Sequence, residues 1–128
     1  MDKKHEHKLE LNKGDIIYRR TIYDDLDISF IEKVDNIFAY ALFDYEQKSF
    51  LKHIDDDGQF HSIEESEFRD PIYSIETPEL QSEYRKKQLY ILTTFIDENL
   101  QNTFLTKELF QEIEILLNEV NNKIVSCF

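Results

Sequence analysis

The residues in this chain that are best suited to binding or catalysis are carboxylates, which occur in three dense groups. The groups are Asp24, Asp25 and Asp27, then Asp55, Asp56 and Asp57, then Glu64, Glu65 and Glu67. Grouped carboxylates can bind a hard cation, share a proton in acid–base catalysis, or face a basic surface. Which of these applies depends on the elements that position them.

The second group comes close to the pattern of a calcium-binding loop. Asp55, Asp57, Gly58 and Glu64 occupy the third, fifth, sixth and twelfth places of that pattern. The first place is His53, a poor ligand for a hard cation, and the flanking residues predict strands where an EF-hand needs helices. We therefore interpret the segment as a turn with solvated carboxylates.

Other candidate residues lack the partners that a metal site, a nucleophile–base pair or a phosphate-binding loop would need. His5 and His7 have no third convergent ligand for a metal, and His61 and Ser62 are adjacent on an expected strand, so they point to opposite faces. Cys127 has no basic partner nearby, and two glycines can hardly supply a phosphate-binding loop. Dense acidic runs between turns are usually solvated, which disfavours acid–base catalysis. We expect a non-enzymatic protein without cofactor or metal.

Composition and charge limit the domain number, the kind of partner and the location that we expect for this chain. The chain has 128 residues, which suits one domain, and a single cysteine, which excludes an internal disulfide. The formal net charge is −12, and residues 21–76 alone carry −11. A field of that sign repels nucleic-acid phosphates and attracts basic protein surfaces. With no long apolar run and no signal peptide, we expect a cytoplasmic location in a bacterial host, away from membranes.

Short apolar runs between turns predict the strands that carry these carboxylates. We expect five or six of them: Ile16–Arg20, Ile28–Val34, Ile37–Phe43, Ser49–Ile54, Gln59–Ile63 and Ile72–Ile75. The continuous apolar run at 37–43 predicts a central strand covered on both faces. Asp57-Gly58 predicts a tight hairpin. The expected class is α+β, with a small antiparallel β-barrel or bent sheet ahead of helices.

Helical spacing begins at Thr77 and Pro78, which suit an N-cap and the first helical position. One apolar stripe of the first helix, reaching about Glu98, consists of Leu80, Tyr84, Ile91, Leu92, Phe95 and Ile96, with Leu89 at its margin. Thr106 is expected to cap a second helix, whose stripe consists of Leu109, Ile113, Leu116, Leu117, Val120 and Ile124.

We expect a flexible tail over 1–12, a barrel-like part over 13–76 and an antiparallel helical hairpin over 77–128. The hairpin is expected to pack on the strands or to pair with a second copy.

Three segments carry a resemblance to a known group of proteins. They are Lys13-Gly14-Asp15-Ile16-Ile17-Tyr18-Arg19, Ser29-Phe30-Ile31-Glu32-Lys33-Val34 and Thr77-Pro78-Glu79-Leu80. The chain resembles small proteins of phages and bacterial mobile elements that open with a "KGDxxYR" strand, form a Tudor/KOW-like small barrel and carry a "TPEL" helix. The resemblance implies a non-enzymatic adaptor or an inhibitor of host defence, of the anti-CRISPR type, and it carries over no catalytic residue.

Three functional hypotheses remain. In the first, the acidic strand half docks on a basic protein, most plausibly one that handles nucleic acid. The expected contact residues are the nine grouped carboxylates above, with Tyr23, Tyr45 and Phe60 as aromatic anchors. In the second, a barrel binds nucleic acid through Arg19, Arg20 and Lys86. In the third, the helical hairpin holds a homodimeric adaptor.

Overall fold

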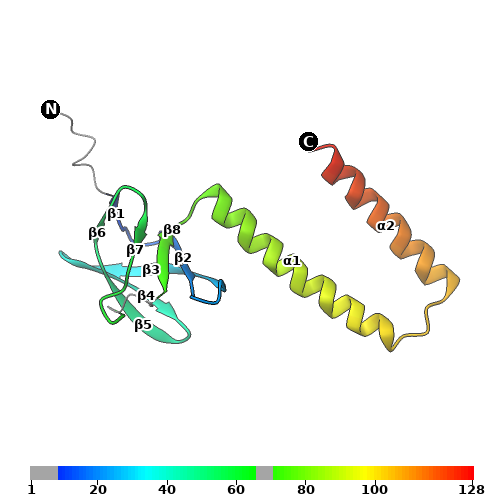
Figure 1. Ribbon diagram of the computed structural model, residues 1–128, viewed down its shortest axis with the longest axis horizontal. Helices are drawn as coiled ribbons and strands as arrows, with labels where there is room; N and C mark the ends of the chain where they lie inside the picture. Colours follow the sequence, from blue (N-terminus) through cyan, green and yellow to red (C-terminus); the bar gives the residue numbers. More distant parts are fainter. Residues whose placement is uncertain (1–8, 66–70) are drawn as a thin grey trace. The chain divides into compact units, whose positions relative to one another are not determined.

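A computed structural model of the chain describes residues 9–65 and 71–128, and it confirms the α+β class (Figure 1). The strands are β1 (Leu9–Glu10), β2 (Ile16–Arg20), β3 (Leu26–Val34), β4 (Phe38–Phe43), β5 (Glu46–Leu51), β6 (His53–Ile54), β7 (Gln59–Phe60) and β8 (Ile72–Ile75). The helices are α1 (Pro78–Gln101) and α2 (Lys107–Val125).

Six of these strands form one antiparallel sheet in the order β5-β4-β3-β2-β8-β7, and β1 pairs with β6 in a separate two-stranded sheet. The larger sheet curls, so that the segment after β7 reaches the opposite edge: the Ile63 N–H donates to the carbonyl oxygen of Ser49 in β5 at 2.7 Å. The curl gives the sheet a concave inner face. The predicted bent antiparallel sheet is therefore confirmed.

The core fills this concave face. Its members are Leu11, Ile17, Ile31, Ala39, Ala41, Phe43, Phe50, Ile54, Phe60 and Tyr73. Phe50 lies at the centre of an aromatic group, with ring centroids 4.8 Å from Tyr73 and 5.2 Å from Phe60, both in edge-to-face geometry. Such pairs stabilise a core by about 0.5–1.5 kcal/mol each beyond the area they bury.

The apolar run at β4 is covered on one face only, so the expectation of a doubly covered central strand is wrong. Ala39 and Ala41 are fully buried on the inner face, whereas Leu42 on the outer face is 42% exposed. Outer Tyr40 is partly shielded by the Lys33 ammonium, which lies 5.0 Å from the ring centroid. Long neighbouring side chains such as Lys33 partly cover the outer apolar positions of this run.

The Asp57-Gly58 segment is a turn, but the predicted hairpin is wrong. The Gly58 N–H donates to the Asp55 carbonyl oxygen at 3.0 Å, and Gly58 has a left-handed φ of 77°. Asp57 does not share the left-handed conformation that a type I′ hairpin requires at both central residues. The strands on either side take different partners, because β6 pairs with β1 and β7 with β8.

The first strand, β1, begins at Leu9, within the segment 1–12 that was expected to be a flexible tail. Leu9 and Glu10 pair with β6, and Leu11 is fully buried in the core. Residues 9–12 therefore belong to the strand part of the fold, and residues 1–8 lie outside the described residues.

Both predicted helix caps are confirmed. The Thr77 hydroxyl accepts the Leu80 N–H at 3.1 Å at the start of α1, and the Thr106 hydroxyl accepts the Leu109 N–H at 3.2 Å at the start of α2. Each hydroxyl satisfies one of the backbone donors that a helix start leaves free. No residue of either helix is buried.

The chain divides into two compact units, Met1–Lys86 and Lys87–Phe128, with the boundary inside α1. The first turns of α1 thus belong with the strands, where Tyr84 meets Tyr18 of β2 at a centroid distance of 5.9 Å. The packing of the helical hairpin on the strands stays a prediction. Among the residues that the structure describes, neither helix combines the length and apolar character that a bilayer crossing requires.

Candidate docking site at the hairpin end

The sheet topology brings two loops to the same end of the molecule. β2 and β4 run in the same direction, because each is antiparallel to β3 between them. The loop 21–25 after β2 and the two-residue turn at Asp44 and Tyr45 after β4 therefore project from one end of the sheet. We call these two loops, with Arg19 and Asp27 behind them, the hairpin end.

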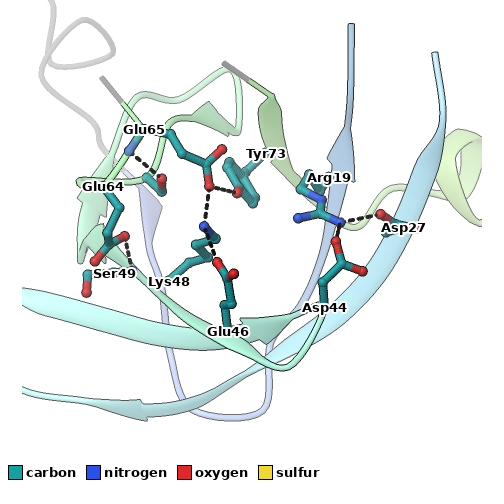
Figure 2. A network of polar contacts seen from close by, with 10 residues as sticks. Arg19, Asp27, Asp44, Glu46, Lys48, Ser49, Glu64, Glu65 and Tyr73 are labelled. Carbon is teal, nitrogen blue, oxygen red and sulfur yellow. Dashed lines mark hydrogen bonds and ion pairs between the residues drawn. The ribbon is translucent and has the colours of Figure 1, made fainter. Parts of the chain in front are cut away.

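Arg19 connects the turn at Asp44 and Tyr45 to β2 and β3, at the base of the loop 21–25. It lies directly opposite Asp27 in the register of β2 and β3, and its guanidinium Nη2 donates to Asp27 Oδ2 at 2.6 Å and to Asp44 Oδ2 at 2.7 Å (Figure 2). The same guanidinium lies 4.9 Å from the centroid of the Phe43 ring. One side chain thus connects β2, β3 and the turn between β4 and β5.

In these two ion pairs the Arg19 guanidinium is buried, whereas its carboxylate partners are more exposed. The Arg19 side chain is 9% exposed, whereas those of Asp27 and Asp44 are 47% and 78% exposed. Burial acts to lower the pKa of Arg19, but the hydrogen bonds to both carboxylates outweigh it and raise this pKa above its ordinary value. In the described structure the buried Arg19 Nε has no hydrogen-bond partner, which costs about 1–3 kcal/mol. Arg19 therefore holds Asp27 and Asp44 while one of its own donors has no partner in the described structure.

Arg20, the next residue, points to the other side of the sheet and holds the loop 21–25. Its Nη1 donates to Asp24 Oδ1 at 2.6 Å, and its two terminal nitrogens donate to the two carboxylate oxygens of Glu83 in α1 at 2.7 Å. Such a two-pronged pair orients the guanidinium firmly. Arg19 and Arg20 are both engaged by carboxylates of their own chain.

Left-handed backbone conformations gather at this end. Among the described residues other than glycine, positive φ occurs at Asp24 (64°), Asp44 (53°) and Tyr45 (65°), and all three lie in the two loops. A side chain in this conformation costs roughly 1–2 kcal/mol, and tyrosine has no local hydrogen bond to offset it. Strain of this kind persists where the surrounding structure over-determines it, and it clusters at functional sites.

The two loops carry exposed aromatic side chains at their tips. Tyr23 is 82% exposed and Tyr45 is 99% exposed. Phe60, the third expected anchor, is only 8% exposed and packs in the core against Phe50, so it is not available at the surface. Two tyrosines, and not three aromatic residues, are therefore placed for contact.

Behind the loops, Lys48 of β5, Glu65 and Tyr73 of β8 form a buried polar network (Figure 2). Glu65 Oε1 lies 2.9 Å from Lys48 Nζ and accepts the Tyr73 hydroxyl at 2.9 Å. The bond to Glu65 raises the pKa of Lys48, and burial, followed by the bond to Glu65, raises the pKa of Tyr73. The neighbouring Glu64 carboxylate accepts the Ser49 N–H at 2.8 Å. Glu65 is thus held inside this network, whereas Glu64 is exposed and bonds the backbone of β5.

The second acidic group lies at the opposite end of the sheet. Asp57 precedes β7, whose first residue pairs with Ser74 near the end of β8, away from the hairpin end. Asp56 and Asp57 border a hollow of about 440 Å³ that also contacts Thr77 and Leu80 at the start of α1. Within the described residues no three metal-ligating side chains converge, and Glu67 lies outside those residues.

The expected carboxylates are therefore split between two ends, and only part of their charge faces outward. The hairpin end carries four carboxylates and one basic side chain, a formal net charge of −3: Asp24, Asp25, Asp27 and Asp44 against Arg19. A partner bound there meets a moderate negative field.

Asp44 is the site residue that the sequence analysis missed. The apolar runs gave no signal for it, because the expected strands Ile37–Phe43 and Ser49–Ile54 leave five residues between them, whereas β4 and β5 leave two. Arg19 offered a signal, because a charged residue within an apolar strand calls for a partner of opposite charge.

Comparisons of the chain with models of protein families, with curated proteins and with solved structures found no match. The resemblance to Tudor/KOW-like phage proteins stays a prediction, and the function has to be argued from the hairpin end itself.

Proposed function

We propose that this chain is a non-catalytic interaction protein whose hairpin end docks on a basic surface of a partner protein in the bacterial cytoplasm. The observation that carries the proposal is the pair of exposed tyrosines on the two loops of the hairpin end. Tyr45 itself has a left-handed φ, and Arg19 bonds both its neighbour Asp44 and Asp27 of β3. Exposed, rigidly presented tyrosines are typical of interface anchors. A fold that only needed the two-residue turn after β4 would place glycine or asparagine at position 45.

The carboxylates beside Tyr23 and Tyr45 indicate which kind of partner protein would bind. Asp25 is exposed, and Asp24, Asp44 and Glu46 present mostly exposed carboxylates beside the tyrosines. Carboxylates in a row can occupy positions where a partner normally holds phosphates. The proposed partner is therefore a protein that handles nucleic acid, and docking would occupy or inhibit its nucleic-acid surface.

Direct binding of nucleic acid by this chain is the weaker alternative. It needs Arg19, Arg20 and Lys86 to reach phosphates. Arg19 is buried against two carboxylates, and Arg20 is held by Asp24 and Glu83. Releasing either guanidinium would break charge-assisted hydrogen bonds worth about 1.5–3 kcal/mol each before discounting for exposure.

The test is affinity capture from a nuclease-treated bacterial lysate, with elution by a salt gradient. The variant D24N/D25N removes two charges beside Tyr23, and asparagine tolerates the left-handed conformation of residue 24. The matched control D55N/D56N removes two exposed charges at the opposite end.

We expect a basic partner that is retained after nuclease treatment, elutes at moderate salt, is lost with D24N/D25N and is kept with D55N/D56N. Equal capture by both variants would refute docking at the hairpin end. Recovery of nucleic acid, or partners that disappear on nuclease treatment, would favour direct nucleic-acid binding.

A further inference from the structure

The helical unit, Lys87–Phe128, exposes an apolar surface that a monomeric protein rarely carries. On α2, Phe110, Leu116, Leu117, Val120 and Ile124 are each 50–63% exposed. Apolar patches on monomeric proteins seldom exceed about 300–600 Å², and larger ones mark interaction sites.

The α1 part of the same unit repeats this feature. Leu89, Leu92, Phe95 and Ile96 are each 54–61% exposed. At roughly 90 Å² for each half-exposed side chain, the nine residues of the two helices expose about 800 Å² in total, which the contact between the two helices and the contact with a partner would share.

The apolar residues of α2 follow a pattern suited to a bundle. Residues 109, 113, 116, 117, 120 and 124 recur at intervals of three and four, and the stripe is wider than the two-position seam of a simple coiled coil. A stripe of this width contacts two neighbouring helices at once. If the two helices of one chain pack on each other, each supplies the other with one neighbour, and the second neighbour has to come from elsewhere.

We infer that the second neighbour is another copy of this chain, and that two hairpins associate about a two-fold axis into a four-helix bundle. Each copy then contributes the same apolar surface, as a closed two-fold interface requires. The charges of α1 favour the antiparallel orientation: Arg85 and Lys86 lie toward one end of the stripe and Asp97 and Glu98 toward the other. Antiparallel copies bring opposite charges close, whereas parallel copies bring like charges close.

The test is light scattering coupled to size exclusion on the full chain over a hundredfold range of concentration. Wild type is expected at twice the 15.5 kDa chain mass, with a shift toward the single-chain mass on dilution. The variant L116E places a charge in the stripe. The matched control I115E places the same charge on the opposite face of α2, at a residue with the same 59% exposure.

We expect L116E to raise the dissociation constant at least tenfold and I115E to leave it within twofold. A single-chain mass for wild type at every concentration would overturn the inference. It would also be overturned if L116E and I115E weakened association equally, because the stripe would then not be the interface. A monomer in which L116E lowers the urea midpoint of the strand unit would assign the stripe to packing on the strands of its own chain.

Discussion

Replacing Tyr45 with glycine is expected to stabilise the fold and abolish docking. Tyr45 has a φ of 65° and a side chain that is 99% exposed, so its removal relieves backbone strain without losing buried contacts. The relief is worth about 1–2 kcal/mol, from which the extra chain entropy of glycine subtracts about 0.5–1 kcal/mol. The net expectation is a gain of about 0.5–1 kcal/mol, or roughly 2–8 °C in melting temperature for a unit of this size.

The assay is urea and thermal unfolding of wild type, Y45G and the control Y45S, followed by the near-ultraviolet signal of the remaining aromatic residues. Serine keeps a Cβ atom, so Y45S retains the strain and is expected to change stability by less than about 0.5 kcal/mol. Both variants lose the anchor ring, so both are expected to lose captured partner. The reasoning fails if Y45G is less stable than Y45S, or if either variant captures the partner as well as wild type does.

Three further predictions concern the parts that support the site. A double-mutant cycle of K48M and E65Q, measured by urea unfolding, is expected to give a coupling energy of about 1–2 kcal/mol, because both side chains are less than one-fifth exposed; a coupling below about 0.3 kcal/mol would contradict a structural ion pair. Burial, then the hydrogen bond to Glu76, raises the pKa of Tyr18 to about 12, and the pKa of Tyr73 is raised as well. The unfolded state therefore loses these protons first above pH 10, so the unfolding free energy should fall from pH 10 to pH 12 and fall less steeply in Y73F; an unchanged slope would be inconsistent with this origin. Replacing Thr106 with alanine should cost the start of α2 about 1 kcal/mol, seen as reduced helical circular dichroism that serine at this position restores, and equal helix content in all three proteins would exclude the cap.

The parts of the fold that depend on local chemistry could be predicted from the sequence. Thr77 and Thr106 start helices because a hydroxyl at that position bonds a free backbone N–H of the first turn, and this requires no distant partner. The antiparallel strands followed from short apolar runs between turns in the same way.

The errors arose where a distant partner decides the local conformation. The turn at Asp44 and Tyr45 lacks the glycine or asparagine that signals a type I′ hairpin, and its Asp44 is held by Arg19, 25 residues earlier in the chain. Asp57-Gly58 has the signal but joins strands that pair elsewhere, so the local rule predicted a hairpin that does not form.

The candidate site was predictable in kind but not in extent. The sequence placed an acidic contact surface with Tyr23 and Tyr45, and both tyrosines are exposed at one end of the sheet. It could not show that the carboxylates separate to two ends, because strand order is a property of the whole sheet. Phe60 shows the same limit, since its alternation in β7 does not say which face the sheet buries.

The most direct test of the account is hydroxyl-radical footprinting of the chain with and without its captured partner. Tyr23 and Tyr45 react freely in the isolated chain, since they are 82% and 99% exposed, and Tyr90 on α1, at 71%, is an internal reference. Docking at the hairpin end predicts that the partner protects Tyr23 and Tyr45 at least fivefold and leaves Tyr90 unchanged. Full reactivity of both hairpin-end tyrosines in the complex would contradict the account.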